Sequence, residues 1–152
     1  MIRTDRRMRL CMAWLLCNLC FIWGNSLLPG EVSQAISDWL KQLLSFSASG
    51  GSGKPGGSGL LRKIAHFAEF ASLGMCLTWL LAMRGKHKAK ALLWGILAAC
   101  VDETIQVFVP NRGPGLKDVA LDTCGVLAGM GVLLLGHNMI KKMKLQLEDN
   151  EQ

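Results

Sequence analysis

Charged residues are absent from two long stretches of this 152-residue chain, residues 73–83 and residues 125–135. A soluble amphipathic helix keeps one polar face toward water, and neither stretch offers one. Hydrophobic residues make up 51% of the chain, which is enough for one apolar domain. The missing charges exclude a fully soluble helical domain.

Cysteine is missing from every connection between the apolar runs. The six cysteines all fall inside those runs, at positions 11, 17, 20, 76, 100 and 124. A disulfide framework is therefore not expected. Cys17 and Cys20 have CxxC spacing but lack the strand–helix–strand context of a redox motif. We interpret the cysteines as small apolar packing residues.

Nucleic-acid-binding motifs and a signal-peptide cleavage site are also missing. The net charge of +6 comes from basic residues that gather between apolar runs, which is typical of the cytoplasmic loops of membrane proteins. No nucleic-acid partner is expected. The basic N-terminus precedes an apolar run over residues 10–28 that no small-x-small site ends, so we expect an uncleaved helix.

Four segments are long and apolar enough to cross a bilayer, which takes about 20 residues. They are residues 10–28, 60–83, 89–109 and 118–136. The sequence thus predicts an all-α, multi-pass protein of the cell membrane: a four-helix bundle over residues 10–136. Basic residues at 1–9, 84–90 and 141–144 place both termini in the cytoplasm, with a cytoplasmic tail over residues 137–152.

The first outer connection, residues 29–59, has two parts. Residues 31–44 carry apolar side chains at helical spacing and predict a short extracytoplasmic amphipathic helix. It could lie on the outer leaflet or cover the mouth of the bundle, and its polar face, which is not strongly basic, favours the cover. Residues 45–59 are rich in Gly and Ser and predict a flexible tether.

Ionisable side chains inside the spans are costly in lipid and are therefore candidates for function. Helical spacing and rise bring residues of three spans to one face and a similar depth in the outer half, where Asn25 and Ser26 could join them. The candidate catalytic residues are His66, Glu69, Asp102, Gln106 and Asp122. The candidate substrate-binding residues are Arg62, Glu103, Arg112 and Asp118.

Alternatives remain open for each group. His66 and Glu69 could be an acid–base pair or a buried hydrogen bond. Asp102 could bind a cation, activate water or form a structural salt bridge. We assign no metal, because no established ligand spacing is present. Arg62, Lys63, Arg112 and Lys117 could hold a phosphate or extend to the lipid headgroups.

Small residues on the fourth span form a GxxxG pattern, Gly125 and Gly129. Such stripes let helix backbones approach closely. A homo-oligomer through these glycines is one expectation.

Three blocks of the chain resemble the VanZ-like family in order and spacing, and a fourth short motif follows the first span. They are KIAHFAEF at 63–70, DETIQVFVPNR at 102–112, DVALDTCG at 118–125 and SLLP at 26–29. The resemblance covers about residues 10–136. Two positions differ from the usual family pattern, which has Tyr in place of Phe70 and Asn in place of Asp122.

The resemblance implies a small cell-envelope membrane protein linked to resistance against teicoplanin, a lipoglycopeptide antibiotic. It names neither a reaction nor a cofactor. The leading hypothesis is recognition or modification of a polar lipid or a peptidoglycan-related substrate at the outer leaflet. An ion- or proton-coupled carrier acting as an oligomer and a non-catalytic membrane scaffold are the alternatives.

Overall fold

The computed structural model describes residues 2–47, 58–113 and 115–150, and within these ranges the chain is helical with no strand. The helices are α1 (Ile2–Ser26), α2 (Gly30–Ser47), α3 (Ser58–Met83), α4 (Ala89–Val107) and α5 (Leu116–Asn150). The all-α prediction is confirmed. The tether expected at residues 45–59 falls mostly on residues 48–57, which lie outside the described residues.

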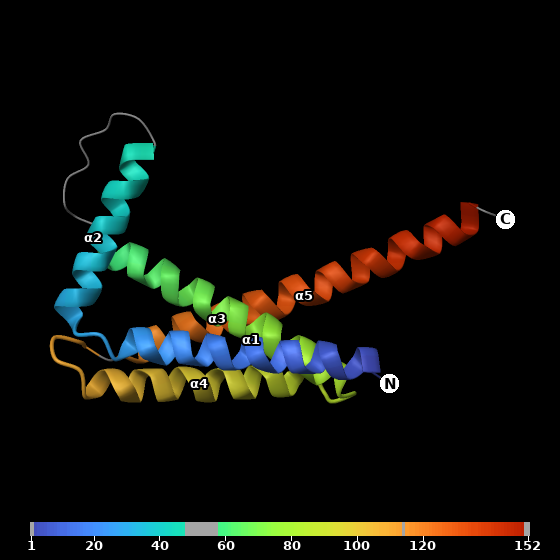
Figure 1. Cartoon of the computed structure of the whole chain (residues 1–152), viewed down its shortest axis with the longest axis horizontal. Coiled ribbons are helices and arrows are strands. Elements are labelled where there is room, and N and C mark those ends of the chain that lie inside the picture. Colours follow the sequence, from blue (N-terminus) through green and yellow to red (C-terminus); the bar gives the residue numbers. More distant parts are fainter. Residues whose placement is uncertain (1, 48–57, 114, 151–152) are drawn as a thin grey trace.

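Helices α1, α3, α4 and α5 pack together, while α2 leads away from them (Figure 1). The core between them is apolar, with Ile22, Phe70, Leu73 and Val126 fully buried. We call the end of the bundle where α1 and α4 end and α3 and α5 begin the polar end. The opposite end, where α3 passes into α4 through several basic residues, is the basic end.

Glycines bring α3 and α5 into direct backbone contact. A Cβ added at Gly125 would lie 2.6 Å from the carbonyl oxygen of Phe67, and one at Gly129 would collide with the carbonyl oxygen of Ala71. Such close approach is what small-residue stripes permit. Within the chain, Gly125 and Gly129 thus pack against α3, and a homo-oligomer through these glycines stays a prediction.

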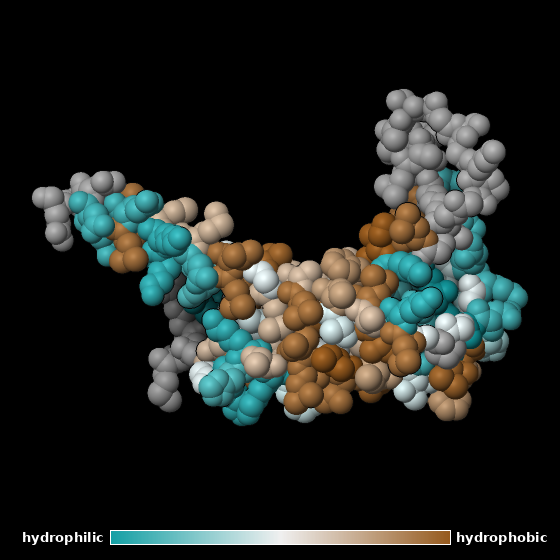
Figure 2. Space-filling model, turned by 180° about the vertical axis from the view of Figure 1, so that it is seen from behind, coloured by the Kyte–Doolittle hydropathy of each residue, from teal (hydrophilic) through white to brown (hydrophobic). Residues whose placement is uncertain are grey.

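Three of the described helices are long and apolar enough to cross a membrane: Arg6–Ser26, Leu60–Met83 and the stretch from Leu116 to Asp149. Figure 2 shows a broad hydrophobic band between hydrophilic ends. Helix α4 lies alongside but is not one of these three, because Lys90, Asp102 and Glu103 all fall within its 19 residues. These features are those of a membrane protein.

The amphipathic segment forms a helix as expected and contacts α3, but four of its apolar side chains are exposed. Val32, Ile36, Trp39 and Leu43 of α2 are all 43% or more exposed. Figure 1 shows α2 rising away from the other helices. A position on the outer leaflet and a cover over the bundle mouth both stay predictions.

Helix α5 is longer than the predicted fourth span, which ended at residue 136. It continues as one helix to Asn150 and extends beyond the bundle (Figure 1). The side chains of residues 137–149 are exposed. The predicted tail is thus a continuation of α5, with Lys141, Lys142 and Lys144 on it.

Candidate functional site

Asp102 on α4 is the centre of a buried polar cluster at the polar end. Its carboxylate accepts a 2.6 Å hydrogen bond from the hydroxyl of Ser26 at the end of α1. The other carboxylate oxygen accepts a 2.8 Å bond from Nε2 of Gln106, one turn further along α4. Ser26 and Asp102 are fully buried and Gln106 is nearly so. These bonds fix the position of the carboxylate.

Gln106 connects this centre to two other helices. Its Nε2 also lies 3.2 Å from the hydroxyl oxygen of Ser26. Its Oε1 accepts a 3.4 Å hydrogen bond from the guanidinium of Arg62 on α3. One amide thus links α1, α3 and α4. Its hydrogen bonds matter for stability, because a polar group left without a partner in an apolar interior is costly.

His66 on α3 faces the same carboxylate. Its Nδ1 lies 3.9 Å from Oδ2 of Asp102, and the side chain is buried. This distance is too long for a direct hydrogen bond but short enough for a charge interaction or a bridging water. Arg62 lies one turn before His66 on α3, as the spacing predicts.

Asp122 on α5 completes the cluster from a fourth helix. It is 1% exposed, and neither carboxylate oxygen has a hydrogen-bond partner among the described residues. One of its oxygens, a nitrogen of His66 and an oxygen of Asp102 all lie within 4.8 Å of one another. Imidazole and carboxylate are ligand types that suit a divalent cation. The three side chains could therefore hold a cation or an ordered water.

Glu69 has a different partner from the one expected. Its Oε1 accepts a 3.1 Å hydrogen bond from Nδ2 of Asn25 on α1, and its Oε2 has no partner among the described residues. His66 pairs with Asp102 instead. The carboxylate next to the imidazole thus comes from α4 rather than from the same turn of α3.

Glu103 holds the loop between α4 and α5 in place. Oε2 of Glu103 accepts a 2.8 Å hydrogen bond from the backbone N–H of Gly115, just before α5 begins. Asp118 in the first turn of α5 is half-buried nearby. Glu103 is therefore a loop anchor that also borders the cavity described below.

Arg112 is turned inward rather than toward the outside. Its Nε and Nη2 donate hydrogen bonds of 3.2 Å and 3.0 Å to the backbone oxygens of Leu28 and Asn25, at the end of α1. Unsatisfied carbonyls at a helix C-terminus favour such a cation. Burial is the main cause that lowers the pKa of the Arg112 guanidinium, with Arg62 adding to it. Arg112 thus anchors α1, and the structure does not place it at the cavity.

A cavity of about 170 Å³ opens at the polar cluster between α3, α4 and α5. Its lining residues are Arg62, Lys63, His66, Glu103, Gln106, Asp118, Leu121 and Asp122. Six of the nine candidate site residues line this cavity, and Asp102 lies in contact with them. Glu69 and Arg112 are not among its lining residues.

Two groups of the candidate site cannot be found by a search of the sequence for charged residues. Ser26 is uncharged, and only its place at the end of the first span indicates that it could join the cluster. The Gly115 N–H belongs to the backbone, which no residue type reveals.

The cavity combines cations at Arg62 and Lys63 with carboxylates and an imidazole, so it can bind an anion, accept hydrogen bonds and exchange a proton.

Comparison with known proteins gives one match. The family model described as VanZ/LLP1 matches residues 11–137. No curated protein and no solved structure matches the chain. The matched region contains α3, α4, most of α1 and α5 as far as residue 137, together with the whole polar cluster. The chain belongs to the VanZ/LLP1 family.

Proposed function

We propose that the chain is a cell-envelope protein that recognises the headgroup of a polar lipid or a peptidoglycan-related molecule at the outer leaflet. In this proposal α1, α3, α4 and α5 all cross the membrane and both termini lie in the cytoplasm. The basic residues at the basic end and on the end of α5 support that orientation. The polar end then faces outward.

The observation that carries this proposal is Asp122, a buried carboxylate that has no hydrogen-bond partner among the described residues and borders a cavity. A buried polar group without a partner is costly, and at Asp122 both carboxylate oxygens lack one among the described residues, which favours a bound group at the cavity. A bound hydroxyl, ammonium group, cation or water would satisfy it. The unpartnered Oε2 of Glu69 is a second such group in the same buried layer.

The residues at the cavity suit a headgroup with both anionic and hydrogen-bond-donating groups. Arg62 and Lys63 border the cavity on one side and would bind a phosphate or carboxylate. Asp118 and Asp122 border it on the other side and would accept bonds from hydroxyl or amine groups. The cavity is smaller than the roughly 300–1,000 Å³ that encloses a drug-sized ligand. It would hold part of a headgroup while the lipid tail stays in the bilayer.

His66 is the group in this cavity that could exchange a proton near neutral pH. Asp102 lies beside it and would stabilise its charged form, and the bonds from Ser26 and Gln106 hold Asp102 in place. A substrate bound at Arg62 would therefore meet an oriented imidazole. Modification of the substrate would then proceed by proton transfer through His66.

The experiment measures teicoplanin resistance in a susceptible bacterial host that expresses the protein. We expect the wild-type chain to raise the inhibitory concentration, and His66→Ala and Asp102→Asn to abolish the gain. His87→Ala is the matched control, because His87 is exposed in the connection between α3 and α4. Should both cluster variants insert normally and retain full resistance, the cluster would be structural and the proposal wrong.

A further inference from the structure

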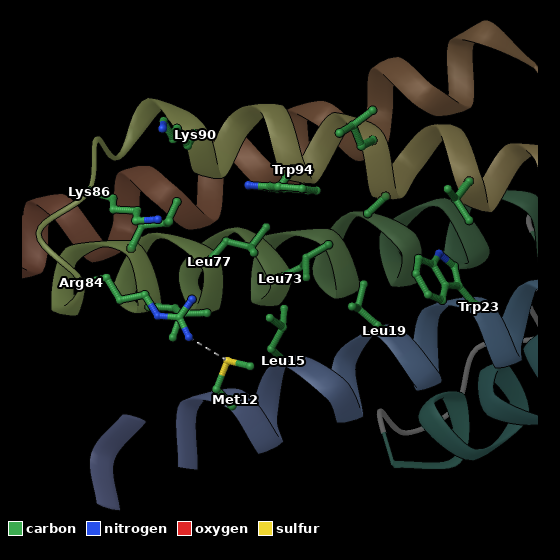
Figure 3. A pocket seen from close by; sticks show the side chains of 15 residues that line it. Met12, Leu15, Leu19, Trp23, Leu73, Leu77, Arg84, Lys86, Lys90 and Trp94 are labelled. Atoms are coloured by element: carbon green, nitrogen blue, oxygen red, sulfur yellow. Dashed lines mark hydrogen bonds between the residues drawn. The ribbon is translucent and has the colours of Figure 1, made fainter. Parts of the chain in front are cut away.

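A long apolar groove lies away from the polar cluster, along α1, α3 and α4. It encloses about 590 Å³. Leu73 and Leu77 of α3 form its floor, Leu15 and Leu19 of α1 face it from one side, and Trp94 of α4 lies on the other (Figure 3). The groove thus offers apolar side chains from three helices to a single elongated occupant.

The groove has the length of one bilayer leaflet. On α1 it extends from Met12 to Trp23, and along α3 from Leu73 to Arg84, the first residue after that helix. Eleven residues of helix rise about 16 Å, roughly half of the 30 Å hydrocarbon core. An acyl chain that starts at the basic end would therefore end near the bilayer midplane.

Three cations stand at one end of the groove. Arg84, Lys86 and Lys90 line that end, and Trp23 lies at the other (Figure 3). All three are exposed, and no carboxylate among the described residues lies within 4.0 Å of them. Within the described part of the chain, the guanidinium of Arg84 has one hydrogen-bond acceptor, the weakly accepting sulfur of Met12 at 3.8 Å. The three cations line the same end of the groove, where an anionic group could bind.

The floor of the groove is part of the folded core, while its α4 side is open to the membrane. Leu73 and Leu77 are buried at 0% and 8% exposed, whereas Trp94 is 56% and Val101 43% exposed. An occupant could therefore enter sideways from the bilayer onto a preformed surface. A lipid is the molecule that combines this route with an apolar chain and a charged head.

We propose that this groove binds one anionic phospholipid of the cytoplasmic leaflet, with its phosphate among Arg84, Lys86 and Lys90 and one acyl chain along Leu77 and Trp94. Charge complementarity selects the anionic headgroup, because cytoplasmic basic clusters next to membrane spans attract anionic lipids. The site is separate from the polar cavity and uses none of its residues. It rests on the orientation proposed above, which puts the basic end in the cytoplasm.

Native mass spectrometry of the full-length protein, delipidated and then supplied with phosphatidylglycerol or phosphatidylcholine, tests this proposal. We expect one molecule of phosphatidylglycerol to be retained in preference to phosphatidylcholine. Replacing Arg84, Lys86 and Lys90 together by Gln should weaken retention about tenfold, because charge-assisted bonds to the phosphate are lost. These side chains are exposed, so the fold should survive the change.

The control replaces Lys141, Lys142 and Lys144 by Gln, which removes the same charge from the exposed part of α5. It should retain phosphatidylglycerol as the wild type does. A second variant, Leu19→Trp, narrows the groove and leaves every cation in place, and it should also lose the lipid.

Three outcomes would overturn the proposal: equal retention of both lipids, unchanged retention by the Arg84, Lys86 and Lys90 variant, or displacement by inorganic phosphate alone. The last would show an anion site without an acyl-chain site. Failure here leaves the teicoplanin assay unaffected, because that assay reads His66 and Asp102 at the opposite end. Conversely, loss of the proposed headgroup site would not change lipid retention at the basic end.

Discussion

Ser26 and Asp102 belong to different helices, and their side chains meet in a 2.6 Å hydrogen bond in the fully buried layer between α1 and α4. A bond of this length to a carboxylate is strong and directional. It couples the end of the first helix to the acidic centre of the cluster. The same contact therefore serves stability and the orientation of the candidate site.

Replacing Ser26 by Ala should lower the free energy of unfolding by about 1–2 kcal/mol, because a buried carboxylate oxygen loses its donor. Thermal unfolding of the purified protein in detergent measures the change. Thr104→Ala is the control, since the Thr104 hydroxyl is exposed and bonds within its own helix, to the backbone oxygen of Cys100. Equal effects of the two changes would show that the Ser26–Asp102 bond contributes nothing.

Gly129→Ala should destabilise the protein by about 1–3 kcal/mol, because the added methyl group would force α3 and α5 apart. Gly131→Ala lies two residues further along the same helix, and its Cβ would meet nothing within 4 Å. Alanine favours helix by about 0.5–1 kcal/mol over glycine, so that control should be neutral or stabilising. Chemical or thermal unfolding compares the two. A harmless Gly129→Ala would contradict the close approach of these helices.

Asp122→Asn should raise the unfolding midpoint by about 2–4 °C, as expected for roughly 1 kcal/mol in a chain of this size. The change replaces a buried carboxyl group that has no hydrogen-bond partner among the described residues, and it puts an amide donor within 4.8 Å of Asp102. Asp118→Asn is the control at a half-buried position beside the same cavity. A fall in the midpoint would indicate instead that the Asp122 carboxylate is held by a bound cation.

Much of the fold follows from the sequence, because apolar length and the positions of charges decide which segments become helices. The helix starting near Leu60 and the amphipathic segment after Pro29 both form where periodicity predicts them. The length of α5 does not follow. The basic residues after position 136 predict a membrane boundary, but nothing in them stops a helix, so α5 continues to Asn150.

The candidate site is predictable as a group but not in its pairings. Helical spacing and rise bring His66, Asp102 and Asp122 to one level, and the structure does bring them together. Spacing along one helix suggests Glu69 as the partner of His66, yet rotation of α1 and α4 relative to α3 decides the contacts. Arg112 illustrates the same limit, because only the folded chain reveals the carbonyls it bonds.

The most direct test of the proposed site compares lipids and cell-wall precursors in cells that express the wild-type chain or His66→Ala, with His87→Ala as control. If the polar cavity acts on an envelope molecule, one lipid-linked or peptidoglycan-related species will change in abundance in His66→Ala cells and stay at the wild-type level in the control. Identical profiles in all three strains, with the proteins equally inserted, would contradict the account.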